Sequence, residues 1–297
     1  MNFELSEEQR MIQQSVERFV EDNYDLNSRV ALSSNSPGFS TENWHSMAEL
    51  GWLGLPFEEE DGGFGGNQID VLVVMEQFGR GLVLEPYLAS IIMGGGALKR
   101  GGTDALKSEI LPQVIEGTLQ LAFAYAEEQS RFDLDDVMTS ARKEGENFIL
   151  NGQKSMVQNA ETADKIVVSA RTSSGQVGPQ GITLFLIDAD AEGLSRDNFP
   201  TVDGLRASEI TLENVSVGPD RILGEVDQGF SILQAVANDA MLALSAEAVG
   251  AMEVLYKDTV DYTQQREQFD HPLSEFQVLQ HRMVDMFMEY EQCKSLL

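Results

Sequence analysis

Three residues near the carboxyl end of the chain have side chains suited to holding a phosphate-bearing ligand. They are Arg266, Gln268 and Phe269 in the stretch REQFDHPL, which lies between two long helical patterns. A guanidinium group offers a fixed fork of donors that matches phosphate oxygens, and a phenylalanine ring offers a flat apolar face. The alternative is an arginine paired with a nearby acid, because acids greatly outnumber bases in this chain.

The composition is that of a globular, strongly acidic protein. Forty-nine acids against twenty bases give a net charge of -29 over 297 residues. This charge repels a phosphate backbone, so we expect no nucleic-acid partner. No apolar run reaches the roughly 18 residues of a membrane span, and the acidic start is unlike a signal peptide. We therefore expect a cytoplasmic protein with no membrane span.

Metal chemistry finds little support in the sequence. The single cysteine, Cys293, cannot form a cysteine cage, and we interpret it as an ordinary residue of a helix face. The three histidines, His45, His271 and His281, do not have the spacing of metal ligands. We predict that there is no metal site.

The periodicity of apolar residues predicts three domains: an N-terminal helical domain over 1–118, a middle β barrel or sandwich over 119–229, and the first part of a C-terminal helical bundle over 230–297. Ser6 and Gln9 form a capping-box pattern at the first helix. The glycine-rich loop PFEEEDGGFGGN follows no strand and carries acids at 58–61. It therefore predicts a flexible turn rather than a phosphate loop.

Local signals predict where several elements begin and turn. Asn151-Gly152 is typical of a tight hairpin between two short strands. An apolar stripe from Leu233 through Ala240 and Leu244 to Leu255 predicts the buried face of the helix that starts near 230. Ser274, with Gln277 three residues later, predicts the N-cap of the last helix.

The order of these domains and several longer stretches resemble the acyl-CoA dehydrogenase family. The stretches include NGQKSMVQNAETADKIVVSART at 151–172, DGLRASEITLENVSV at 203–217, AEAVGAME at 246–253 and YTQQREQFDHPLSEFQVLQHRMVDM at 262–286. The resemblance extends over nearly the whole chain.

The resemblance implies FAD as cofactor, an acyl-CoA thioester as substrate and an electron-transfer flavoprotein or similar acceptor. In the family a carboxylate removes the proton next to the thioester carbonyl while a hydride leaves to the flavin. The family's Arg-x-x-Phe corner reaches the FAD of a neighbouring subunit, so Arg266, Gln268 and Phe269 are implied as FAD-binding residues of an oligomer. Asp270 stands where the family usually has glycine.

The chain departs from the family where the flavin ring is usually held. The family's loop contains a Thr-Glu-Pro followed by Gly-Ser-Asp, and the matching stretch here is AEEQSRFD at 126–133, with Arg131 and Phe132 at the Gly and Ser positions. Bulky side chains there would narrow the cleft. Further cofactor-binding candidates implied by the match are Phe123, Tyr125, Ala126, Met156 and Gln158, of which Met156 and Gln158 replace a usual Trp and Thr.

The catalytic base is not evident in the sequence. Most members carry it on a helix that would lie beyond Leu297, and others carry it at the position of Ala240. Glu247 lies two turns on, at the edge of the apolar stripe, where burial would raise its pKa. It is the reserve candidate, with Asp239 behind it, although a structural role for Glu247 at a subunit interface is the commoner situation.

These observations leave three functions open. The first is a subunit of a heteromeric acyl-CoA dehydrogenase that lends Arg266, Gln268 and Phe269 to FAD held mainly by a related partner. The second is a self-sufficient homo-oligomeric flavoenzyme. The third is a non-catalytic paralogue that stabilises a partner subunit and binds no flavin.

Overall fold

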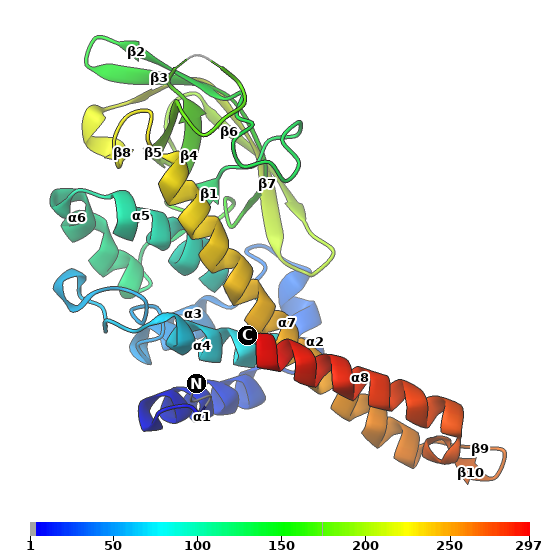
Figure 1. Cartoon of the computed structure of the whole chain (residues 1–297). Helices are drawn as coiled ribbons and strands as arrows, with labels where there is room; N and C mark the ends of the chain where they lie inside the picture. The colour runs from blue at the N-terminus through cyan, green and yellow to red at the C-terminus, as the bar shows by residue number, and fades with distance from the viewer. Residues whose placement is uncertain (1–3, 174) are drawn as a thin grey trace. The chain divides into compact units, whose positions relative to one another are not determined.

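The computed structural model describes residues 4–173 and 175–297 (Figure 1). Its contacts divide the chain into two compact units. The first unit consists of the segment up to Leu26 together with Gln68–Val83 and Met241–Leu297, and the second consists of Asn27–Asn67 and Leu84–Ala240.

The fold has a helical N-terminal part, a β-rich middle and a helical C-terminal part. The helices are α1 (Glu7–Asn23), α2 (Leu26–Ser33), α3 (Thr41–Glu49), α4 (Gln68–Gly81), the π-helix η2 (Tyr87–Gly95), α5 (Gly96–Gly101), α6 (Asp104–Ile115), α7 (Phe230–Gln265) and α8 (Gln277–Leu296). Three-residue 3-10 turns occur at η1 (Glu59–Asp61), η3 (Pro219–Arg221) and η4 (Leu273–Glu275). The predicted class of fold is confirmed, and the limits at 118 and 229 stay a prediction.

The start of α1 agrees with the sequence pattern. The Ser6 hydroxyl accepts the Gln9 backbone N–H, and the Gln9 side chain accepts the Ser6 N–H, which completes the capping box. Val16 and Val20 are the buried residues of this helix. Within the first unit, α1 packs on α4, and the Gln9 amide donates to Asp70 at 2.9 Å.

The middle part is a mixed, mostly antiparallel sheet. Its strands are β1 (Leu121–Ala124), β2 (Ser140–Glu144), β3 (Asn147–Gln158), β4 (Lys165–Arg171), β5 (Ile182–Asp188), β6 (Leu194–Pro200), β7 (Arg206–Val217) and β8 (Ile222–Leu223). They run in the order β6-β7-β3-β2-β4-β5-β8, and β1 pairs in parallel with β4.

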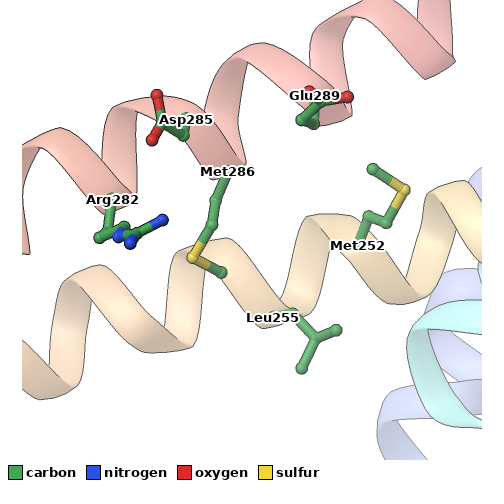
Figure 2. Close-up of a pocket in the computed structure, with 6 residues that line it drawn as sticks. All are labelled: Met252, Leu255, Arg282, Asp285, Met286 and Glu289. Carbon is green, nitrogen blue, oxygen red and sulfur yellow. The ribbon is translucent and has the colours of Figure 1, made fainter.

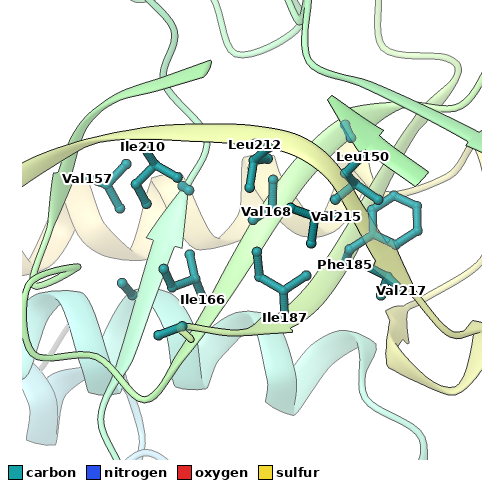
Figure 3. Packing of buried hydrophobic residues seen from close by; sticks show 14 of the residues in the cluster. Leu150, Val157, Ile166, Val168, Phe185, Ile187, Ile210, Leu212, Val215 and Val217 are labelled. Carbon is teal, nitrogen blue, oxygen red and sulfur yellow. The ribbon is translucent and has the colours of Figure 1, made fainter. Parts of the chain in front are cut away.

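The core of this sheet is a single cluster of aliphatic and aromatic side chains. Figure 3 shows residues from four strands directed into one interior, among them Leu150, Ile166, Phe185 and Leu212. Phe148 and Phe185 pack at a ring-centroid distance of 5.3 Å. The strands β3 and β7 bury mainly alternate residues, as period-two patterning predicts, whereas β1, β4 and β5 are buried on both faces.

The predicted hairpin at Asn151-Gly152 is wrong. β3 continues through both residues, and the pairing with β7 shifts register between Leu150 and Gly152 because β7 has one extra residue opposite Asn151, so the bulge lies on β7. A Cβ on Gly152 would lie 2.6 Å from the Thr139 backbone, so glycine is required there for close strand approach. The actual β2–β3 turn lies around Gly145, where φ is +64°. The Asn-Gly signal thus marks a close approach of two strands, because a glycine permits such an approach as well as a tight turn.

The C-terminal helices differ from the sequence prediction in two details. The N-cap of α8 is Phe276 and not Ser274, because residues 273–275 form the turn η4 and no side chain caps the helix. In α7 the buried positions include Leu233, Val236, Ala240 and Ala243, whereas Leu244 and Leu255 of the predicted stripe are exposed. The buried face is therefore rotated relative to the predicted one.

Close contact with α4 explains which face of α7 is buried in the first unit. A Cβ on Gly79 would lie 1.8 Å from the Glu247 carbonyl oxygen, and a Cβ on Gly250 would lie 1.9 Å from the Glu76 carbonyl oxygen. Each helix thus presents a glycine to the backbone of the other. The position of this pair of glycines, rather than the run of alanines, decides which residues face α4.

One helix also meets the criteria of length and composition for a membrane span. It is α7, and only these two properties qualify it. Core helices of soluble proteins pass the same test, so the observation is weak evidence.

Candidate functional site

The loop that matches the family's flavin-binding segment is anchored by Glu127, which the sequence analysis did not single out. We call residues 126–133 the flavin-face loop. The Glu127 carboxylate accepts the Met138 N–H at 2.7 Å, the Thr139 N–H at 3.1 Å and the Lys154 ammonium at 2.7 Å. Lys154 is fully buried and also donates to the Ser169 hydroxyl at 2.9 Å. This ion pair fixes the flavin-face loop to strands β3 and β4.

Burial and the ion pair shift the pKa values of Glu127 and Lys154 in opposite directions. Burial raises the pKa of the Glu127 carboxyl, but Lys154 and the hydrogen bonds outweigh it, so the pKa lies below its ordinary value. Burial lowers the pKa of Lys154 to about 8 although Glu127 opposes the shift. At neutral pH both groups are charged, which is the state that the short contact requires.

Two residues beside this anchor adopt a backbone conformation that favours glycine. Arg131 has φ of +50° and Met156 has φ of +53°. A left-handed conformation at a long side chain is uncommon and costs roughly 1 kcal/mol or more. Arg131 stands where the family usually has glycine, so the backbone keeps the shape that a glycine would allow.

The same region exposes three large apolar side chains. Phe132 is 96% exposed, Met138 60% and Met156 54%. The segments that carry them meet at Glu127, since its carboxylate binds Met138 and Lys154, and the Ser155 N–H donates to the Ala126 carbonyl at 2.9 Å. Such apolar exposure is typical of a surface that another group covers.

The remaining cofactor-binding candidates of the middle domain lie on β1, on β3, on the flavin-face loop and, for Tyr125, between β1 and that loop. Phe123 is buried in β1 and packs on Tyr125 at 5.7 Å, so its side chain offers little surface to a ligand. Tyr125, Ala126 and Gln158 are half-buried. Burial raises the pKa of the Tyr125 hydroxyl. Their contact with FAD stays a prediction.

The corner that carries Arg266 is a two-stranded hairpin in the first unit. β9 (Glu267–Gln268) pairs with β10 (His271–Pro272), and the two residues between them, Phe269 and Asp270, have φ of +58° and +63°. Both central residues of the turn are therefore left-handed, as in a type I′ turn. Asp tolerates this conformation better than Phe does, and the family's usual glycine at 270 would tolerate it best.

The hairpin presents its candidate side chains to solvent. Arg266, Gln268 and Phe269 are exposed, and Phe269 is 85% so. The Arg266 backbone is fixed on both sides, since its N–H donates to Tyr262 and its carbonyl accepts from Leu273. In the part of the chain that the structure describes, no ion pair within 4.0 Å involves the Arg266 side chain. The alternative of an arginine already paired with an acid therefore loses support.

The two reserve candidates for the base have structural contacts. Asp239 forms an ion pair with Arg100. Glu247 is half-buried on α7, at the point where its own backbone carbonyl faces Gly79. The Ala240 side chain is buried in the second unit. Neither carboxylate is singled out by this geometry, so a catalytic role for Glu247 stays a prediction.

One signal for the anchor was present in the sequence. Lys154 interrupts a run of alternating apolar residues in NFILNGQKSMV, at a position whose side chain faces the interior. A buried lysine requires a partner carboxylate. Glu127 lies 27 residues earlier, and no local pattern connects the two.

Comparison with protein families identifies the chain. Its residues 6–118, 122–215 and 227–297 match the N-terminal, middle and C-terminal domains of acyl-CoA dehydrogenase. The protein belongs to the acyl-CoA dehydrogenase family of FAD-dependent oxidoreductases.

Individual relatives support the same assignment. The probable acyl-CoA dehydrogenase YngJ of Bacillus subtilis is 29% identical over 302 residues, which cover 100% of this chain and 79% of that protein. The caffeyl-CoA reductase-Etf complex subunit CarC of Acetobacterium woodii is 29% identical over 99% of this chain and 78% of its own length. A solved structure of PigA with FAD and proline superposes with a TM-score of 0.91 at 28% identity, covering 99% of this chain and 78% of that one.

Proposed function

We propose that this chain is one subunit of a heteromeric acyl-CoA dehydrogenase and has a degenerate flavin face of its own. The proposal depends mainly on Arg131, which occupies the family's usual glycine position with φ of +50°. A glycine there permits close approach of a cofactor to the backbone, and an arginine does not. The exposed Phe132 and Met156 add bulk on the same face. These residues fit a flavin poorly.

The Arg266 hairpin supplies the second half of the proposal. Its exposed guanidinium and its Phe269 ring fit the pyrophosphate and an adjacent flat part of FAD held mainly by a related partner subunit. When bound, FAD accepts the hydride that leaves the acyl chain. The residues of this chain would contribute charge and orientation to it.

The substrate that we propose is a dicarboxylic acyl-CoA such as pimeloyl-CoA. Three stretches of the sequence resemble the small subunit of a pimeloyl-CoA dehydrogenase, namely GLPFEEEDGGFGG, LVLEPYL and AEAVGAMEVL. For the electron acceptor we propose an electron-transfer flavoprotein, since the relative from Acetobacterium woodii is named as a subunit of an Etf complex.

We further propose that residues 1–297 alone do not dehydrogenate an acyl-CoA. Ala240 offers no base where some members carry one, and Glu247 is the reserve. Turnover by the purified chain that disappears in Glu247→Gln, with the melting temperature unchanged, would instead make Glu247 the base.

The visible spectrum of the purified chain tests the proposed function. We expect no flavin absorbance from the chain alone and a flavin spectrum after co-expression with a related acyl-CoA dehydrogenase subunit. Flavin in the chain alone would contradict the proposal and favour the self-sufficient flavoenzyme, and flavin in neither sample would favour a structural paralogue.

A matched variant tests the reason for the result. Arg131→Gly combined with Phe132→Ser restores the family's usual residues on the flavin-face loop. If bulk blocks the site, this variant alone should bind more FAD than the unmodified chain. Equal binding in titrations of the two proteins would contradict the proposed cause.

A further inference from the structure

The register of the hairpin that carries Arg266 brings three polar side chains to one face. β9 and β10 pair Gln268 with His271, and the Leu273 N–H donates to the Arg266 carbonyl at 2.8 Å, so Arg266 and Leu273 are the next hydrogen-bonded pair. Paired residues share a face of a hairpin, and so do residues two apart in one strand. Arg266, Gln268 and His271 therefore lie on the same face.

This face of the hairpin offers hydrogen-bond donors to a ligand. The Arg266 guanidinium is exposed, and the Gln268 amide gives one N–H to the Glu267 carbonyl at 2.9 Å and keeps a second one. The Glu267 side chain lies on the opposite face, because it stands between Arg266 and Gln268 in the strand. A chain with a net charge of -29 thus keeps this strand's acid away from its donors.

The imidazole ring of His271 is held by a carboxylate. Its Nδ1 lies 2.9 Å from Oε2 of Glu275, which belongs to the turn η4. In a protonated imidazole both ring nitrogens donate, so the contact with Glu275 uses one donor and leaves the Nε2–H for a second acceptor. The His271 side chain is 62% exposed, so a ligand can reach this donor.

The hairpin is fixed at its base and at its tip. It joins α7 to α8 (Figure 1), and these helices pack through Tyr256 and Phe287, whose ring centroids lie 5.7 Å apart. Figure 2 shows Met286 directed from α8 toward α7 as well. At the tip, Phe269 packs against Phe276 at 6.4 Å. Side chains on such a support lose less freedom when they bind a ligand.

We propose that His271 is a further ligand of the FAD pyrophosphate beside Arg266, and that Glu275 is a positioning residue that orients the imidazole ring. The inference rests on the proposed function, in which this hairpin meets FAD held mainly by a related subunit. Phosphate oxygens accept hydrogen bonds and carry negative charge. The shared face supplies guanidinium, amide and imidazolium donors for them.

Flavin affinity of the assembly with a co-expressed related subunit tests the role of His271. We expect His271→Gln to bind FAD about tenfold more weakly than the unmodified assembly. Riboflavin has no phosphate, so its affinity should stay unchanged. The matched control is His281→Gln, which makes the same substitution on an exposed residue of α8 and should change neither affinity.

The pH dependence of the loss gives a second readout. Only the protonated ring has a donor left beside its contact with Glu275, so the loss caused by His271→Gln should be larger at about pH 6 than at about pH 8. The other charged groups around the ring are Arg266 on the same face and Asp270 in the turn. A loss of equal size at both pH values would contradict an imidazolium donor.

A double-mutant cycle tests the role of Glu275. Glu275→Gln alone should weaken FAD binding about threefold, and it should cause no further loss when it is added to His271→Gln, because it acts only through the ring. Losses that add up fully would show that Glu275 does not act through His271.

The outcomes separate this inference from the proposed function. An unmodified assembly without flavin would overturn both. If the assembly holds flavin and Arg266→Ala weakens FAD binding while His271→Gln does not, only the inference is overturned. The same holds if His271→Gln weakens riboflavin binding as much as FAD binding, or if it lowers the melting temperature of the chain and leaves the FAD affinity unchanged.

Discussion

Glu127 and Lys154 form a 2.7 Å ion pair in which the lysine side chain has no exposed surface. Replacing Lys154 with Met leaves the buried carboxylate without its counter-charge, so we expect a loss of about 3–5 kcal/mol in the free energy of unfolding. Denaturant titration of the variant measures it. Lys143→Met, at an exposed strand residue, is the control and should change stability by less than about 0.5 kcal/mol.

Adding Glu127→Gln to Lys154→Met tests the cause. The amide keeps an acceptor for the neighbouring N–H groups and removes the unpaired charge, so the double variant should be more stable than Lys154→Met alone. A double variant as unstable as the sum of both changes would show that the charge is not responsible.

Glu85 gives a pH dependence of the opposite sign to that of most carboxylates. Its side chain is 5% exposed, one oxygen accepts the Ser40 N–H at 3.3 Å, and the other has no hydrogen-bond partner among the described residues. Burial raises the pKa of Glu85 from its ordinary 4.5 to about 7. The native state therefore binds more protons than the unfolded state between these two values.

The stabilising contribution of Glu85 is therefore fully present below about pH 4.5 and is lost as the pH rises through about 7. The loss is on the order of 3 kcal/mol. Glu85→Gln should remove this pH-dependent loss. The free energy of unfolding of the variant minus that of the unmodified chain should therefore rise between pH 5 and 8. Unfolding curves at several pH values measure this difference, and a constant difference would contradict the raised pKa.

Arg266 should affect cofactor affinity and not folding. Its side chain is exposed, so Arg266→Ala should leave the melting temperature of the isolated chain nearly unchanged. A charge-assisted bidentate contact is worth roughly 1.5–3 kcal/mol, which predicts about tenfold to hundredfold weaker FAD binding by the assembled oligomer. Flavin fluorescence measures the affinity, with Arg18→Ala as an exposed control on α1. Equal affinities would make the hairpin a structural corner.

The α4–α7 contact should not accept a side chain at Gly250. Alanine favours a helix over glycine by about 1 kcal/mol, so Gly250→Ala would stabilise α7 if space allowed it. The new Cβ would lie 1.9 Å from the Glu76 carbonyl oxygen, so we expect the helices to separate at a cost of about 1–3 kcal/mol or more. Thermal unfolding measures the net sign. Ala248→Ser, exposed on the same helix, is the control.

Local chemistry made some of this fold predictable. The Ser6–Gln9 capping box was readable because both partners lie within one turn. The Glu127–Lys154 pair was not, because its partners are brought together only by pairing of distant strands. The prediction at Gly152 was wrong because a glycine that permits close approach of a neighbouring strand and one that permits a turn look alike until the neighbouring strand is known.

For the candidate site, the sequence identified Arg131 and Met156 as departures from the family's residues. Their left-handed backbone could not be inferred, because a long side chain alone predicts the opposite.

The position of Asn151 and Gly152 inside β3, opposite the bulge of β7, has a consequence for how the protein ages. In a flexible chain, the nitrogen of a glycine that follows asparagine readily attacks the side-chain amide and releases ammonia. Here the Asn151 amide oxygen accepts the Asn214 N–H at 2.9 Å, its nitrogen donates to the Asn214 side chain at 3.3 Å, and Gly152 pairs within the sheet. The glycine nitrogen can attack only after these contacts break. The rate of deamidation at Asn151 therefore measures how often this part of β3 separates from the sheet.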